Sequence, residues 1–85
     1  MKPAEHVRAN VTNDGLVVLD INKGEIFSAN IIAARIWQGI VIDGKPKEEI
    51  VDSIVKEWGS TPDVVARDLD AFVDKLKKQE LVVEA

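Results

Sequence analysis

The chain has 85 residues, of which 46% are hydrophobic and 31% charged, and its formal net charge is −4 at pH 7. This composition excludes intrinsic disorder, and a chain of this length predicts one domain over residues 1–85 with a single modest core. The acidic balance argues against nucleic-acid binding, which needs Lys and Arg gathered on a positive face. No apolar run approaches the length of a membrane span, and residues 1–10 lack the features of a signal peptide. We therefore expect a cytoplasmic protein with no membrane partner.

The first third of the chain has the pattern of short strands. Val7, Ala9 and Val11 alternate with polar residues, which predicts a strand with one buried face. Two further aliphatic segments follow, each preceded by a turn signal rich in Asn, Asp and Gly. The pattern predicts a three-stranded antiparallel meander with strands at residues 6–12, 16–21 and 25–29.

The remaining two thirds predict three helices, so the fold class is α+β. Asn30 can cap the first helix, which is so apolar that it must be central. Gly44 fits the residue after its end, and Pro46 fits the first turn of the second helix. Thr61 as cap and Pro62 at the first helical position open the third. The expected helices span residues 31–43, 46–58 and 62–79.

Most large apolar side chains are predicted to lie in the core. Trp37 and Trp58 each belong to an apolar helical stripe, which favours burial over a stacking site. Ile26 is likewise expected in the core, whereas for Phe27 the core and a groove stay equally open. Residues 81–83 are expected to fold back onto the body. The third helix has a core stripe made of Val65, Leu69, Phe72, Val73 and Leu76.

The inventory of reactive side chains is thin, because the chain has no Cys, no Tyr and a single histidine, His6. It contains no catalytic triad, zinc motif or glycine-rich phosphate loop. Asp70 and Asp74 stand one helical turn apart, a spacing that can poise two carboxyl groups for acid–base chemistry. A solvated helix face is the commoner explanation of that spacing. We expect no enzyme activity, no metal at His6 and no cofactor.

Five short segments of the chain resemble the running pattern of a known family. They are Leu19-Asp20, Gly24 to Phe27, Ala29-Asn30, Ala34 to Trp37 and Arg67 to Phe72. The pattern is similar to that of the leader-peptide recognition elements, also called the pyrroloquinoline quinone biosynthesis protein D family. The likeness extends from about Val7 to Val83, and it is greatest to the discrete leader-binding proteins of lasso-peptide gene clusters. The chain departs from the family at residues 40–42, which are unusually apolar, and at Glu80, where a glycine often precedes the residue matching Leu81.

The resemblance implies a winged-helix-like domain that binds the leader segment of a ribosomally made precursor peptide. The third strand, over residues 23–29, would leave one edge open beside the third helix, and the leader would add there as a fourth strand. The expected strand edge is Glu25, Ile26, Phe27, Ser28 and Ala29. The expected helix wall is Val64, Arg67, Asp68, Ala71, Phe72 and Lys75.

The resemblance also implies roles for side chains in this groove. Arg67 and Lys75 would pair with leader carboxylates and Asp68 would accept a hydrogen bond, with a solvated helix face as an equal alternative for each. A leader of the lasso family usually carries a Tyr and a Pro. The expected receptor for these is an apolar pocket lined by Phe27, Val64, Ala71 or Phe72.

The implied mechanism is presentation of the precursor to a separate cysteine-protease-like leader peptidase, with the ring-closing enzyme as a further candidate partner. Tethering raises the effective concentration of the scissile site at the enzyme without any bond chemistry in this chain. Three alternatives stay open: a peptide chaperone for a radical enzyme, as in quinone-cofactor assembly, a winged-helix DNA-binding regulator, and a small carboxylate enzyme. The balanced charges of the third helix weigh against DNA. Pairing of two copies through the open strand is also open.

Overall fold

The computed structural model describes residues 1–84. Its main sheet is antiparallel with the order β2-β3-β4, and three helical segments follow it in the chain. This arrangement confirms the predicted α+β class with strands first and helices second. The elements are β1 (Lys2–Pro3), β2 (Val7–Val11), β3 (Leu16–Asp20), β4 (Glu25–Ala29), α1 (Ile31–Ile36), η1 (Trp37–Ile42), α2 (Lys47–Trp58), α3 (Pro62–Lys78) and β5 (Val82–Val83).

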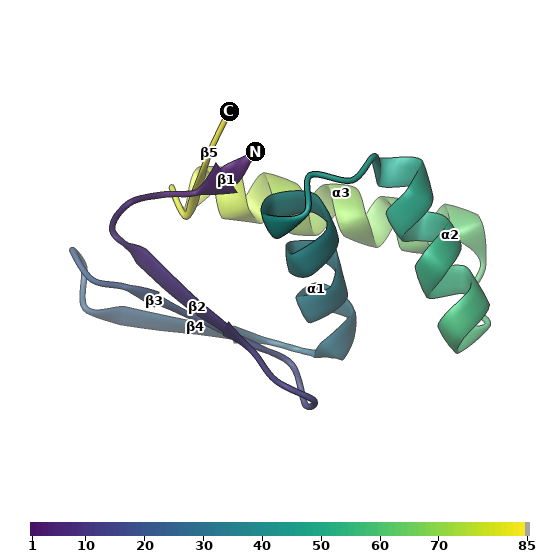
Figure 1. Ribbon diagram of the computed structural model, residues 1–85, viewed down its shortest axis with the longest axis horizontal. Helices are drawn as coiled ribbons and strands as arrows, with labels where there is room; N and C mark the ends of the chain where they lie inside the picture. Colours follow the sequence, from purple (N-terminus) through teal and green to yellow (C-terminus); the bar gives the residue numbers. More distant parts are fainter. Residues whose placement is uncertain (85) are drawn as a thin grey trace.

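The segment α1–η1 lies between the sheet and the other two helices (Figure 1). Its residues Ala34, Trp37 and Val41 pack into a sheet-side core with β2, β3 and the end of α3. Ile36, on the other side of the same segment, packs into a helix-side core with α2 and α3. A helix that packs on two opposite sides needs apolar residues on both of them, so the central position of this segment explains most of its apolar pattern.

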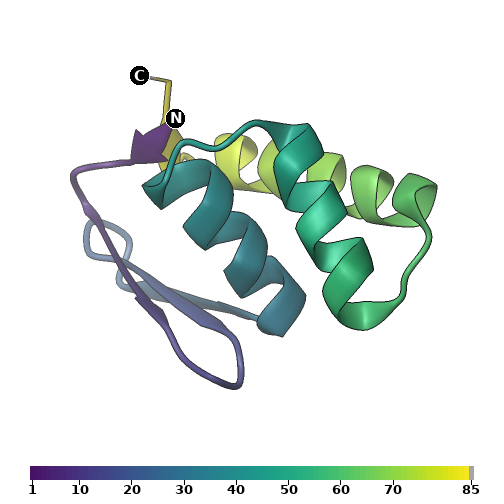
Figure 2. The same cartoon turned by 45° about the vertical axis from the view of Figure 1, so that its right-hand side comes forward.

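A second, two-stranded sheet joins the two ends of the chain. β1 pairs antiparallel with β5, and Ala4 N–H donates to the Leu81 carbonyl at 3.0 Å. The N-terminus and the C-terminal segment therefore lie side by side in both views (Figures 1 and 2). The expectation that residues 81–83 fold back onto the body is confirmed. Their partner strand at Lys2–Pro3 was not predicted, because two residues are too few to show a period.

Two predictions about burial outside β4 are wrong. Val7 is buried, but Ala9 and Val11 are exposed, because α1 packs over β3 and none of the described helices covers the far half of β2. Trp58 is 38% exposed at the last position of α2, past the helix-side core. The Arg35 guanidinium carbon lies 5.4 Å from the centroid of its ring, a cation–π contact.

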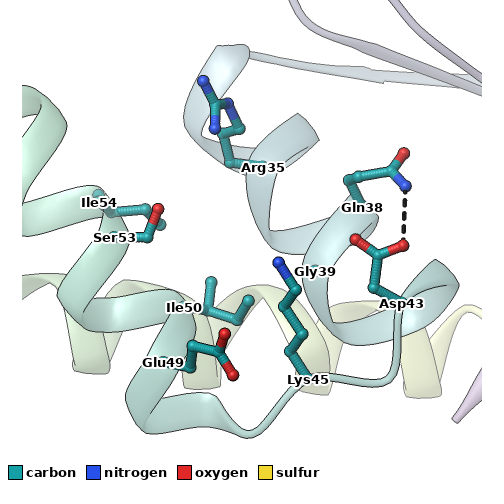
Figure 3. A pocket seen from close by; sticks show the side chains of 9 residues that line it. All are labelled: Arg35, Gln38, Gly39, Asp43, Lys45, Glu49, Ile50, Ser53 and Ile54. Atoms are coloured by element: carbon teal, nitrogen blue, oxygen red, sulfur yellow. Dashed lines mark hydrogen bonds between the residues drawn. The ribbon is translucent and has the colours of Figure 1, made fainter.

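The first predicted helix is not α-helical throughout, because residues 37–42 form a π-helix. Within it Gly39 allows a close approach to α2: a Cβ at this position would collide with the Ile50 Cδ1 methyl group. Figure 3 labels Gly39 on η1 and Ile50 on α2, the two segments that meet at this contact. Gly39 therefore lets the buried Ile50 side chain pack against the helix backbone, and a side chain at this position would force Ile50 to move.

We predict that Gly39→Ala lowers the free energy of unfolding by about 1–2 kcal/mol, since overpacking outweighs the propensity gained. Ile50→Val removes the colliding methyl group, so it should recover most of that loss when combined with Gly39→Ala. Urea denaturation of the two single variants and the double variant measures this coupling. Strictly additive effects would contradict the close contact.

The helix ends follow the predicted signals only in part. Asn30 is confirmed as the cap of α1, because its Oδ1 accepts from Ala33 N–H at 3.0 Å. Thr61 stands at the N-cap position of α3, but its side chain makes no capping hydrogen bond. Pro46 is the N-cap residue of α2 and not part of its first turn, because the pyrrolidine ring fits the extended backbone there equally well.

Glu80 has the left-handed backbone conformation that favours glycine, with φ of 60°. It follows the end of α3, where Leu81 N–H donates to the Leu76 carbonyl at 3.0 Å in a helix-terminating turn. This conformation explains why a glycine is expected here. We predict that Glu80→Gly raises the free energy of unfolding by about 0.5–1 kcal/mol, as measured by urea denaturation. Glu80→Ala removes the same side chain but keeps the strained conformation, so it should bring no gain.

Candidate functional site

The hydrogen-bond phase of the main sheet shows which backbone groups are left free. Thr12 N–H donates to the Gly15 carbonyl at 2.8 Å, and Ile21 N–H donates to the His6 carbonyl at 2.9 Å. In an antiparallel ladder, hydrogen-bonded pairs alternate with non-bonded pairs. The odd-numbered residues of β3 therefore bond to β2, and the even-numbered ones bond to β4. The residues of β3 that bond to β4 are Leu16, Val18 and Asp20.

The same phase leaves Ile26 and Ser28 as the open positions of β4. The partners of the even-numbered β3 residues are Ala29, Phe27 and Glu25, whose N–H and C=O groups are used by β3. The main-chain groups of Ile26 and Ser28 point the other way, where no strand follows among residues 1–84. β4 is thus an edge strand with donors and acceptors ready for another strand.

The side chains of β4 alternate between the two faces of the sheet. Phe27 and Ala29 share the inner face with the buried Val18 and Leu16 and pack against the sheet-side core. Ile26 lies on the outer face beside Leu19 and is 73% exposed. The prediction of Ile26 in the core is wrong, because no helix of residues 1–84 covers the outer face of the sheet. Phe27, for which a core and a groove position were both open, packs against the core and also lines a pocket.

A pocket of about 220 Å³ opens between the inner face of β4 and the end of α3. We call it the edge pocket. Four of the residues predicted for the peptide site line it, namely Glu25, Ile26, Phe27 and Lys75. Sequence reasoning missed the rest of its wall, which is formed by Val18, Asp20, Lys23, Gln79 and Leu81.

Phe27 connects β4 to α3 across this pocket. Its ring centroid lies 6.2 Å from that of Phe72, and the two planes are tilted by 30°. Lys75 places its ammonium group 4.7 Å from the Phe27 centroid. Lys75 forms no ion pair with any residue of the described part of the chain, so its charge remains available to a ligand in the edge pocket.

Asp20 is the one buried charged residue among residues 1–84, with 4% exposure, and it lies at the wall of the edge pocket. Its Oδ1 accepts from Lys23 N–H at 3.0 Å, which holds the turn between β3 and β4. Its Oδ2 lies 3.7 Å from His6 Nε2. Asp20 thus fixes the turn from which the open strand starts.

Four of the five remaining predicted wall residues lie on exposed positions of α3. Val64 is 49% exposed, and Arg67, Asp68 and Ala71 are also exposed. In the described part of the chain neither Arg67 nor Asp68 forms an ion pair, and their proposed contacts with a leader stay a prediction. Phe72 is half-buried and touches both cores.

The carboxylates that were weighed for catalysis are engaged in ion pairs. Asp70 pairs with Lys47 at 2.8 Å and Asp74 with Lys78 at 3.0 Å, all at the surface. Over residues 1–84 no three His, Asp or Glu side chains lie close enough together to hold a metal ion. No helix within the same residues is both long and apolar enough to cross a membrane.

The chain belongs to the family described as coenzyme PQQ synthesis protein D, whose model matches residues 15–82. Two solved structures are similar over nearly the whole chain. One, "TbiB1 in Complex with the TbiA(beta) Leader Peptide", is 33% identical with a TM-score of 0.83, covering 100% of this chain and 98% of that chain. The other, "Lasso peptide synthetase B1 complexed with the leader peptide", is 25% identical with a TM-score of 0.86, covering 98% and 96%. No curated protein matches the chain.

Proposed function

We propose that this protein binds the leader segment of a ribosomally made precursor peptide by strand addition to β4. The observation that carries the proposal is the open edge of β4, where the main-chain groups of Ile26 and Ser28 face outward beside the edge pocket. An added strand takes its affinity from main-chain hydrogen bonds and its selectivity from side-chain pockets. The two similar structures are both complexes with a leader peptide, which supports the same ligand class here.

The two faces of β4 offer different environments to an added strand. Side chains of the leader that point inward would meet Phe27 and Lys75 in the edge pocket, where an apolar body and a carboxylate both find partners. Side chains that point outward would pack beside Ile26 and Leu19, both of which are exposed in the free protein. An added strand would therefore give Ile26 a cross-strand neighbour on the open side of β4.

The proposal also includes the predicted wall residues of α3 that lie outside the edge pocket. A leader that continues past the edge pocket along α3 would meet Val64 and Ala71 as apolar contacts. Arg67 would then pair with a leader carboxylate, and Asp68 would accept a hydrogen bond. All four side chains are exposed and so open to a ligand.

We further propose that the bound leader is presented to a separate cysteine-protease-like leader peptidase, with the ring-closing enzyme as a second possible recipient, and that this chain performs no bond chemistry. The ion pairs of Asp70 and Asp74 support the absence of bond chemistry, because a surface lysine binds each of these two carboxylates. Holding the precursor at the enzyme accelerates cleavage by raising the effective concentration of the scissile bond.

The experiment that tests the proposal is fluorescence anisotropy of a labelled leader peptide, taken from a precursor gene beside that of this protein and titrated with the full chain. Saturable binding is the expected result. No binding at roughly 100 μM protein, a concentration above that of useful peptide recognition, would refute it. A salt-dependent shift of duplex DNA would instead favour a DNA-binding regulator.

A further inference from the structure

A second groove lies between α2 and α3. Its volume is about 300 Å³, and we call it the helix groove. Val51 and Val55, one turn apart on α2, form one apolar side, and Pro62 and Ala66, one turn apart on α3, form the other. Two parallel rows of small side chains with a furrow between them are the surface into which the side chains of a further helix pack.

The helix groove faces away from the edge pocket. Ala66 precedes Lys75 by nine residues of α3, which at 3.6 residues per turn is two and a half turns. The two side chains therefore leave α3 on opposite sides, about 180° apart. A molecule in the helix groove would leave the open edge of β4 free, so both sites can be occupied together.

The rim of the helix groove is acidic. Three carboxylates line it, those of Glu48, Asp52 and Asp63, against the single ammonium group of Lys47, which bonds to a carboxylate of α3 outside the groove. Asp52 pairs with Lys56 at 3.0 Å, whereas Glu48 and Asp63 form no ion pair with any residue the structure describes. An apolar floor with uncompensated carboxylates at its rim complements a surface that is apolar and basic.

We propose that the helix groove docks a basic amphipathic helix of the enzyme that receives the leader-bound precursor. The proposal rests on the function proposed above, because it needs a partner that binds while the leader is in place. Aliphatic side chains of that helix pack over Val51 and Val55, and its Lys or Arg side chains reach Glu48 and Asp63. A second copy of this chain fits less well, because two molecules that each carry a charge of −4 repel one another.

The test uses two synthetic helical peptides with leucines along one face, one carrying lysines on the other face and the second carrying glutamates. Each is titrated into the ¹⁵N-labelled full chain at about 150 mM salt, where long-range attraction is screened. The lysine peptide should shift the amide signals of Val51, Val55 and Ala66, and the glutamate peptide should shift none. Equal binding of both peptides, or shifts spread evenly over the acidic surface, would overturn the proposal.

A pair of charge-matched variants separates the groove from net charge. Glu48→Lys with Asp63→Lys should weaken the lysine peptide about fivefold or more. Glu5→Lys with Asp14→Lys changes the net charge by the same amount at exposed positions outside the groove, so it should change the affinity less than twofold. Equal losses in the two variants would refute a specific groove.

Leader binding is measured on the same proteins as an independent readout. Both double variants should bind the labelled leader peptide as the unchanged chain does, and saturating leader should leave the affinity for the lysine peptide unchanged within twofold. Failure of the leader to bind any of these proteins, with peptide binding at the groove intact, would refute the leader function and not the groove. Competition between leader and lysine peptide would refute the independence of the two sites.

Discussion

Ile26→Pro should weaken leader binding by roughly 10- to 100-fold while leaving the protein folded. The Ile26 N–H points to the open edge, so proline removes a donor that an added strand would use and none that β3 uses. The leader carbonyl that loses this donor is left unsatisfied, at a cost of about 1–3 kcal/mol, and each 1.4 kcal/mol is a factor of ten in affinity. Anisotropy with the labelled leader peptide gives the affinity, and far-UV circular dichroism reports the fold.

The opposite edge of the sheet offers a matched control. Arg8 and Asn10 lie at the hydrogen-bonded positions facing β3, so the N–H of Ala9 between them points outward from β2. Ala9→Pro therefore repeats the same change on an exposed residue of the other edge strand. It should leave leader affinity within twofold of the original. Loss of binding in Ala9→Pro, with Ile26→Pro unaffected, would place the added strand on β2 instead.

The secondary structure of the main sheet could be predicted because its signals are local. Alternation of side chains and turn residues determine β3 and β4 within the chain segment itself. Burial needs knowledge of what lies above each strand, and this is not local. Ala9 has the pattern of a buried position, yet α1 lies over β3 and leaves it exposed.

The candidate site was predicted only in part, because several of its residues come together through contacts that are not local in the sequence. The strand edge and Lys75 followed from the family pattern, but Gln79 and Leu81 reach the edge pocket only because the chain turns back after α3. Asp20 did leave a signal in the sequence. It stands two residues after Val18, at an inward-facing position of an apolar strand, where a charged residue needs a specific partner.

The two tryptophans should differ widely in their effect on stability, although their sequence patterns predicted the same environment. Trp37 is 1% exposed at the centre of the sheet-side core, so Trp37→Ala should lower the free energy of unfolding by about 3–5 kcal/mol. That is a large part of the roughly 5–15 kcal/mol available to a domain. Phe27 packs against the same core, so Trp37→Ala should also loosen the packing of Phe27 in the edge pocket.

Trp58→Ala should cost only about 0.5–1.5 kcal/mol, because the ring is partly exposed and its main specific partner is the Arg35 guanidinium. Urea denaturation followed by circular dichroism compares the two variants without relying on the fluorescence of the residue removed. Equal losses would contradict the placement of Trp58 beyond the helix-side core. Trp37 packs with Phe27 in the sheet-side core, whereas Trp58 does not. We therefore expect Trp37→Ala to lower leader affinity and Trp58→Ala to leave it unchanged. That result would show that the effect on the edge pocket is transmitted through the sheet-side core.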